Sequence, residues 1–203
     1  MLRLDKWLAE MTEGSRAEVK KWIRQGRVYV NETKVQRPET KLDPGRDQVT
    51  LDGEQIIYEQ FCYYMLNKPA GVVSATTDRE HKTVIDLLQE ANTQDVFPVG
   101  RLDIDTEGLL LLTNDGALAH ELLSPRKHVD KTYFVRIAGN LSDADVKQLE
   151  QGMDIGDEKL TLPAKVSCLE QFPEEQEQTV TIKLREGRYH QVKRMFAKVG
   201  HPV

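Results

Sequence analysis

The apolar positions at the start of the chain recur with the period of an α-helix. They fit the i, i+3, i+4, i+7 pattern of one helix face: Leu4, Trp7, Leu8 and Met11. Ser15 and Glu18 then have the spacing of a capping box, which predicts that a second helix begins there. Alternating positions at residues 27–31 and 48–51 predict two short strands. We therefore expect a small unit of two helices and a hairpin-like sheet over residues 1–58.

The pattern changes near Tyr58, where we expect a second, α+β unit to begin and to extend over residues 59–203. Alternating or apolar runs predict its strands at residues 62–66, 96–99, 131–137, 164–169 and 179–184. Helical patterns predict helices at residues 84–88, 116–123, from 142 onward and at 188–199. The acidic segment from Glu170 to Gln178 is expected to be a surface loop. Leu109 to Leu112 form the longest apolar run, which predicts a buried strand.

Composition places the chain among globular proteins. It has 203 residues, of which 39% are hydrophobic and 30% charged. Its longest apolar run is far too short to cross a bilayer, and its start has no signal-peptide core, so we expect a cytoplasmic protein that does not bind membranes. Cys62 and Cys168 have no metal-ligand spacing, and we expect no zinc site.

Charge is distributed unevenly along the chain. The net charge is −5, yet the first 27 residues carry seven cations and four acids. The cations are Arg3, Lys6, Arg16, Lys20, Lys21, Arg24 and Arg27. Such a basic region is a candidate contact for nucleic acid, although charged helix faces are more often only solvated. The order of elements resembles the α-L (S4-type) RNA-binding fold, which implies that these seven residues contact RNA phosphates.

A polar loop lies between two predicted strands, at Gly100 to Gly108. It contains Arg101, Asp103 and Asp105. Working side chains are often held on such loops. A solvated turn whose aspartates bond to the backbone explains the same residues equally well.

Three stretches of the second unit together resemble the pseudouridine synthases of the RsuA and RluA groups. They are Gly100-Arg-Leu-Asp-x-x-Thr-x-Gly-Leu109, Lys131-Thr-Tyr133 and Glu186-Gly-Arg-Tyr-His-Gln-Val-Lys-Arg-Met195. Lys68-Pro69 fits the family as well, and the variants present are most similar to the RsuA branch. The resemblance implies an isomerase that converts one uridine of small-subunit (16S) ribosomal RNA, or of an assembling small subunit, to pseudouridine. Large-subunit RNA as the target, and a non-catalytic factor that binds ribosomal RNA, remain the alternatives.

The resemblance also implies the fold and the needs of the reaction. It implies an α-L domain followed by a catalytic domain with a mixed, mostly antiparallel sheet and flanking helices. Family members continue with a further strand beyond the position of Val203. The reaction needs no cofactor and no metal, and the sequence contains no phosphate-binding loop or dinucleotide motif. We expect a monomer.

By the motif match, Asp103 is the catalytic carboxylate. A carboxylate closed off from water keeps its charge best when a cation lies against it, and the matching cation is Lys193, with the adjacent Arg194 as the competitor. Asp105 is expected to stabilise the loop, and Asp115 to cap the helix that follows it.

The remaining site residues have weaker assignments. Tyr133 matches the family tyrosine that packs against the target base; without the motif, a tyrosine facing the core would be the better interpretation. Arg101 either braces the loop or fills the space left by the flipped uridine. Arg188 and Gln191 lie at the start of the last helix, where they can shape the site or contact phosphate.

Overall fold

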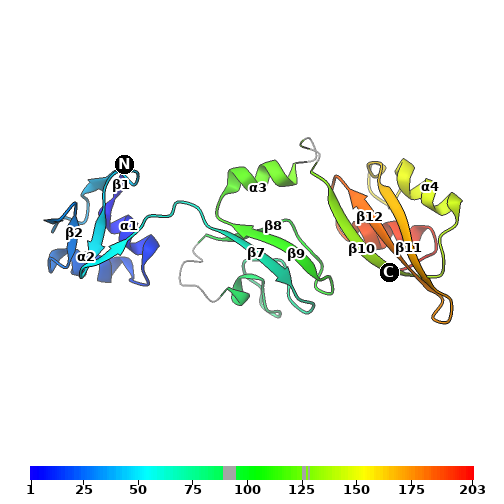
Figure 1. The fold of residues 1–203 in the computed structure, drawn as a ribbon, viewed down its shortest axis with the longest axis horizontal. Helices are drawn as coiled ribbons and strands as arrows, with labels where there is room; N and C mark the ends of the chain where they lie inside the picture. The colour runs from blue at the N-terminus through cyan, green and yellow to red at the C-terminus, as the bar shows by residue number, and fades with distance from the viewer. Residues whose placement is uncertain (89–94, 125–126, 128) are drawn as a thin grey trace. The chain divides into compact units, whose positions relative to one another are not determined.

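The computed structural model of the chain describes residues 1–88, 95–124, 127 and 129–203 (Figure 1). The chain forms two compact units, residues 1–115 and residues 116–203. Each unit is α+β, and each is described by itself.

The first 58 residues fold as two helices and short strands around one core. The elements are β1 (Leu2–Arg3), α1 (Leu4–Met11), α2 (Arg16–Arg24), β2 (Val28–Val30), β3 (Thr33–Lys34), β4 (Lys41–Leu42), β5 (Val49–Leu51) and β6 (Glu54–Ile56). The strands form an antiparallel sheet in the order β3-β2-β5-β6 and a separate β1-β4 pair. The predicted capping box is present, with Ser15 and Glu18 each bonded to the backbone of the other. The helices bury the expected apolar faces, since Leu4, Leu8 and Val19 are fully inside.

A second core within the first unit lies against the three-stranded sheet β7-β9-β8. Its elements are β7 (Tyr63–Lys68), the short 3-10 helix η1 (Ile85–Leu87), β8 (Phe97–Val99) and β9 (Gly108–Thr113). Both strand pairs are antiparallel. Leu110 and Leu112 of β9 face the core, together with Val72, Val84 and Val96.

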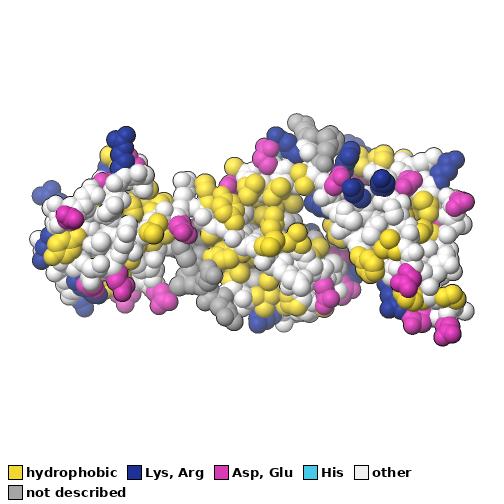
Figure 2. Space-filling view, in the orientation of Figure 1, with side chains coloured by type: hydrophobic (Ala, Val, Ile, Leu, Met, Phe, Trp, Pro, Cys, Tyr) yellow, Lys and Arg dark blue, Asp and Glu magenta, His cyan; other side chains and the backbone are white. Residues whose placement is uncertain are grey.

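The apolar run of β9 is buried on one face only, so the expectation of a buried strand was half wrong. Leu110 and Leu112 are inside, but Leu109 is 66% exposed, and Met65 on β7 shares its face at 79%. Successive side chains of a strand point to opposite faces, and the core of this sheet lies on one of them. Figure 2 shows the hydrophobic side chains gathered over β7 and β9.

The second unit packs two helices on a three-stranded sheet. Its elements are α3 (Gly116–Leu123), β10 (Lys131–Ala138), α4 (Asp143–Gln151), β11 (Lys165–Phe172), β12 (Glu177–Leu184) and α5 (Gln191–Lys198). The sheet is antiparallel in the order β10-β12-β11. Leu149 of α4 and Met195 and Phe196 of α5 are fully buried in its core, with Val180 and Ile182 of β12.

Two expected boundaries in this unit were wrong. The acidic segment is a tight hairpin end between β11 and β12 rather than a loop over residues 170–178. Its carboxylates are held by Arg136, which forms ion pairs with Glu175 and Glu177 and lies over the ring of Phe172. The last helix starts at Gln191 instead of Arg188, because His190 has a left-handed backbone conformation with φ 47°.

The cores follow the sequence in three separate groups. The first contains only residues up to Tyr58, the second residues 62–112, and the third residues 133–199. The expected domain boundary after residue 58 stays a prediction. No helix within the described part of the chain is long and apolar enough to span a membrane.

Candidate active site

The loop from Gly100 to Gly108 connects β8 to β9 at the end of the sheet of the first unit. Val99 pairs with Leu111, and Gly108 pairs with Lys68, so both ends of the loop are fixed by strand pairing. Gly100 and Gly108 have φ values of 93° and 121°, in a region that only glycine enters easily. Between them the amide of Thr106 donates to the carbonyl of Asp103 at 3.0 Å, which closes a tight turn. The catalytic candidate therefore lies on a turn with a defined shape.

A buried lysine holds this turn from inside. Lys68 has no exposed surface, and its Nζ donates to the backbone carbonyls of Asp103 at 3.0 Å and Thr106 at 2.8 Å. It also reaches the carbonyl of Pro69 at 3.0 Å. Burial lowers the pKa of the Lys68 amine, and the negative charges of Asp105, Asp103 and Glu107 act in the opposite direction. An ammonium without exposed surface thus takes the place of water for the loop carbonyls.

A second set of bonds ties the loop to the segment after β7. The hydroxyl of Ser74 donates to the carbonyl of Leu102 at 2.8 Å and accepts from the Leu102 amide at 3.0 Å. The amide of Gly71 donates to the carbonyl of Ile104 at 2.7 Å. These bonds all act on the backbone of the loop. Asp103 is half-buried, whereas Arg101 and Asp105 are exposed.

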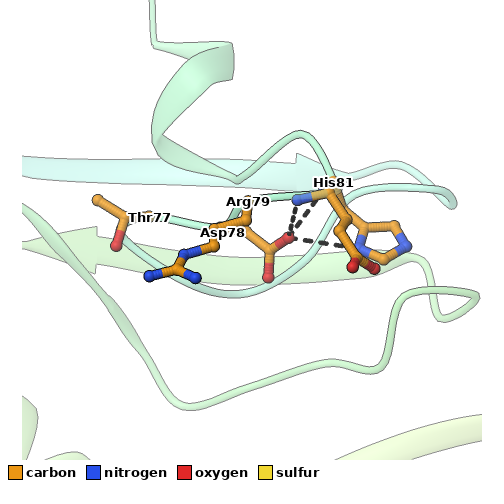
Figure 3. A pocket seen from close by; sticks show the side chains of 5 residues that line it. Thr77, Asp78, Arg79 and His81 are labelled. Atoms are coloured by element: carbon orange, nitrogen blue, oxygen red, sulfur yellow. Dashed lines mark hydrogen bonds and ion pairs between the residues drawn. The ribbon is translucent and has the colours of Figure 1, made fainter.

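The loop from Thr77 to His81 forms a shallow hollow of its own in the same unit. Asp78 accepts from the amides of Glu80 at 2.9 Å and His81 at 2.8 Å, and its carboxylate lies 3.3 Å from Nδ1 of His81 (Figure 3). These bonds hold the pKa of Asp78 below its usual range. The residues that line the hollow are Thr77, Asp78, Arg79, Glu80 and His81, and none belongs to the Asp103 loop. We assign no chemistry to it.

Tyr133 and Lys193 both belong to the second unit. Tyr133 is half-buried on β10, opposite Ile182, and packs against the core of that unit. Lys193 is half-buried on α5. Their predicted association with Asp103, which belongs to the first unit, stays a prediction.

Arg188 and Gln191 form a bonded cluster around Glu186, which is itself buried. Arg188 donates to the Glu186 carboxylate at 3.0 Å and to the carbonyls of Lys159 and Leu160 at 2.6 and 2.7 Å. The side-chain amide of Gln191 donates to Glu186 at 2.8 Å and accepts from the Arg188 backbone at 2.9 Å. These contacts give both residues a structural role, and their contact with RNA stays a prediction.

Arg194 is engaged in a similar way, next to Lys193. Its guanidinium forms an ion pair with Asp157 at 2.6 Å and donates to the carbonyls of Ile155 at 3.1 Å and Tyr189 at 3.0 Å. The hydrogen bond from Arg194 lowers the pKa of Asp157; burial acts in the opposite direction, and Arg188 adds to the lowering. These contacts give Arg194 a structural role, and the pairing of Lys193 with the catalytic carboxylate stays a prediction.

The seven cations of the N-terminal region differ in their partners. Arg3 pairs with Asp5, Lys6 with Glu10 and Arg27 with Asp52. The other four, all on α2, are Arg16, Lys20, Lys21 and Arg24. They are exposed, and the described part of the chain provides them with no ion pair. The α2 cations are therefore the strongest candidates for RNA phosphates among the seven.

The buried network around the Asp103 loop and Glu186 was not predicted from the sequence. Lys68-Pro69 stood out only as a family motif, and nothing in the pattern showed that the lysine binds loop carbonyls. The roles of Glu186 and Asp157 also depend on contacts over 24 to 37 positions in the chain. Within the described residues, no group of three or more His, Cys, Asp or Glu side chains is placed to hold a metal ion.

Comparisons with known proteins identify the family of the chain. A family model described as RNA pseudouridylate synthase matches residues 62–198, and an S4 domain model matches residues 2–47. An uncharacterized RNA pseudouridine synthase of Bacillus subtilis, YtzG, is 44% identical over 203 residues, which are 100% of this chain and 84% of that protein.

Named relatives and a solved structure extend the match. The ribosomal small subunit pseudouridine synthase A of Escherichia coli (strain K12) is 42% identical over 100% of this chain and 85% of its own length. The ribosomal large subunit pseudouridine synthase B of Bacillus subtilis is 37% identical over 100% of this chain and 82% of its own length. A crystal structure of a pseudouridylate synthase aligns with TM-score 0.62 and 34% identity, over 100% of this chain and 85% of that one. The chain belongs to the RNA pseudouridylate synthase family, whose members are isomerases, and carries an S4 domain before the catalytic region.

Proposed function

We propose that this pseudouridine synthase modifies one uridine of ribosomal RNA, with small-subunit 16S RNA as the target. The higher identity to the small-subunit enzyme of Escherichia coli, 42% against 37% for the large-subunit enzyme of Bacillus subtilis, supports this target. One observation carries the proposal: the family motif is present, and its Asp103 lies on a turn pinned by a buried lysine. A large-subunit target is the second candidate, because that relative also matches the whole chain.

The reaction explains why a single carboxylate can suffice. The bond between C1′ of ribose and N1 of uracil breaks, the base turns, and C1′ bonds to C5. A proton leaves C5 and N1 gains one, so the product is an isomer and no redox partner or group donor is needed. We propose that Asp103 acts as nucleophile or base in this sequence. The pinned backbone fixes the carboxylate in advance, which favours a near-attack geometry.

The other predicted residues receive supporting roles in the proposal. Lys193 provides positive charge for the Asp103 carboxylate, and Tyr133 packs against the flipped uracil, where a stacked ring contributes about 1–3 kcal/mol per base. Arg101, exposed on the same loop as Asp103, occupies the gap left by the flipped base. The α2 cations bind phosphates, which adds affinity without sequence readout.

The target can be tested by mapping pseudouridine in ribosomal RNA from cells with and without the protein. Loss of one site in 16S RNA is the expected result. Loss of a site in large-subunit RNA would replace the proposed target with the alternative. If neither RNA loses a site, the chain acts as a ribosomal RNA-binding factor and the proposed function is wrong.

Asp103→Asn is the direct test of the catalyst, with Asp105→Asn as its matched control two positions away on the same loop. The first change keeps the size of the side chain but replaces one carboxylate oxygen with an uncharged NH2 donor, so pseudouridine formation should fall by about 10³-fold or more. The control should keep its rate within about tenfold, because Asp105 is assigned no chemical step. Single-turnover conversion of the mapped RNA measures both, and an active Asp103→Asn protein would exclude the assignment.

Lys193→Met tests the proposed cation, and Lys198→Met on the same helix is its control. Removing the charge should lower kcat about 10²-fold with little change in KM, since the interaction is made with the reacting carboxylate. Lys193→Arg should recover part of the rate. Steady-state kinetics on the same RNA provide the measurement. Equal kcat values for Lys193→Met and Lys198→Met would remove Lys193 from the site.

A further inference from the structure

Two aromatic rings stack directly before α5 in the second unit. The ring centroids of Tyr189 and His190 are 3.8 Å apart, and the planes differ by 18°. Tyr189 is 68% exposed, while His190 is half-buried. One face of the tyrosine ring is therefore covered by the imidazole, and much of the remaining ring surface faces solvent. Tyr189 has no part in the reaction proposed above.

The backbone under the two rings is held in place. Arg194 donates from its side chain to the Tyr189 carbonyl at 3.0 Å and from its amide to the His190 carbonyl at 2.9 Å. On the other side, the Arg188 amide donates to the Gln191 side chain at 2.9 Å. His190 has φ 47°, a conformation that side chains with a Cβ rarely adopt and that is concentrated at functional sites. The pair is thus presented rigidly, which reduces the entropy lost when a ligand binds.

Packing inside the protein does not account for the tyrosine. A tyrosine that serves the fold usually buries its ring and bonds its hydroxyl. Here most of the side chain is exposed, and the described part of the chain offers its hydroxyl no hydrogen-bond partner.

The surrounding charge points to a nucleic acid. From Gly187 to Val203 the sequence contains Arg188, Lys193, Arg194 and Lys198 and no Asp or Glu. Arg188 and Arg194 also pair with Glu186 and Asp157, so the cationic character of the segment as a whole, and not one single cation, favours an anionic partner. A flat ring beside cations suits a base with its phosphate, whereas an apolar protein partner would need a wider apolar patch here.

We propose that the exposed face of Tyr189, backed by His190, stacks against an unpaired base of the RNA substrate. The contact is distinct from the uracil contact assigned to Tyr133, and its substrate class depends on the proposed function. Stacking accepts any base, so Tyr189 holds RNA without selecting a sequence. The second ring keeps the tyrosine in a fixed plane.

The test uses the full-length protein and a single-stranded oligouridylate of about ten nucleotides with 2-aminopurine at one internal position. Stacking on Tyr189 should quench the fluorescence of 2-aminopurine on binding. Tyr189→Phe should keep both the quenching and the affinity within about twofold, because the ring is retained. Tyr189→Leu, which retains an apolar side chain but no ring, should lose the quenching and weaken binding about 5- to 140-fold, the range that corresponds to stacking of one base.

Phe134→Leu is the matched control, because Phe134 is also 68% exposed and belongs to the same unit. It should change neither signal. The proposal is wrong if Tyr189→Leu quenches and binds as Phe134→Leu does, or if the unaltered protein binds without quenching. Repeating the titration with the Asp103→Asn protein separates the two proposals. Stacking on Tyr189 is then measured without conversion of uridine. If the stacking proposal fails in this assay, the pseudouridine mapping result is unaffected.

Discussion

Lys68 in the first unit and Arg194 in the second each fix a segment that carries predicted site residues, but they do so with different partners. Lys68 has no exposed surface and bonds to backbone carbonyls of the Asp103 loop, with no ion pair among the described residues. Arg194 is partly exposed and combines carbonyls with a carboxylate, Asp157. The lysine braces its loop without drawing in a side-chain acid.

The difference has consequences for chemistry and for stability. A carboxylate partner would have offset the free-energy cost of burying the charge of Lys68. One acid of the loop would then have been committed to that ion pair. Carbonyl partners satisfy the hydrogen bonds of the Lys68 amine without a carboxylate, at the expense of burying a charge with incomplete compensation. The charge of Arg194 is neutralised locally by Asp157. We therefore expect Arg194 to contribute less than Lys68 to the free energy of unfolding, and its contribution to depend on pH. Three changes test this contrast.

Lys68→Met should have the largest effect on stability. It leaves the loop carbonyls without their donor, which should lower the free energy of unfolding by about 2–4 kcal/mol. Lys82→Met, an exposed lysine of the same unit, is the control and should stay within about 0.5 kcal/mol. Urea unfolding followed by circular dichroism measures both. Hydrogen exchange should rise at residues 100–108 in the first variant alone, and equal stability of the two variants would refute the pinning role.

Arg194→Met should have an intermediate effect. It removes the ion pair with Asp157 and the bonds to the carbonyls of Ile155 and Tyr189, which should lower stability by about 1–3 kcal/mol. Faster hydrogen exchange is expected at residues 187–191 and not in the Asp103 loop. Lys198→Met on the same helix, with an exposed side chain, is the control. A change confined to the 100–108 segment would contradict the division between the two networks.

The smallest effect should come from the pH dependence of Asp157. Arginine partners lower the pKa of its carboxyl in the folded state, so the stabilisation is fully present above the ordinary value of about 3.9 and is lost as pH falls through the lowered value. Asp157→Asn should therefore lower the melting temperature at pH 6, and its difference from the unaltered protein should shrink below about pH 4. A difference that stays constant down to pH 3 would show that the charge of Asp157 is unimportant.

Local patterns predicted much of the fold. The Ser15 capping box, the helical face of Leu4 and Trp7, and the existence of the strands were found from spacing alone, because caps and amphipathic faces depend on neighbours within a few positions. Errors occurred where distant contacts decide. The β11–β12 hairpin extends into the acidic segment because Arg136, about 40 positions earlier in the chain, binds its carboxylates. Exposure of Leu109 depends on which face of the sheet receives a core, which an uninterrupted apolar run does not reveal.

The sequence by itself determined the family, the chemistry it implies and the candidates Asp103, Tyr133 and Lys193, since motifs preserve residue type and spacing. Only the tertiary structure showed that the Asp103 loop is organised around a buried amine 35 positions earlier in the chain. It likewise distinguished the exposed α2 cations from the paired ones. It also showed that Arg194 forms an ion pair with Asp157. These outcomes depend on desolvation and on distances between remote side chains. Folding creates both, and neither is encoded in local spacing.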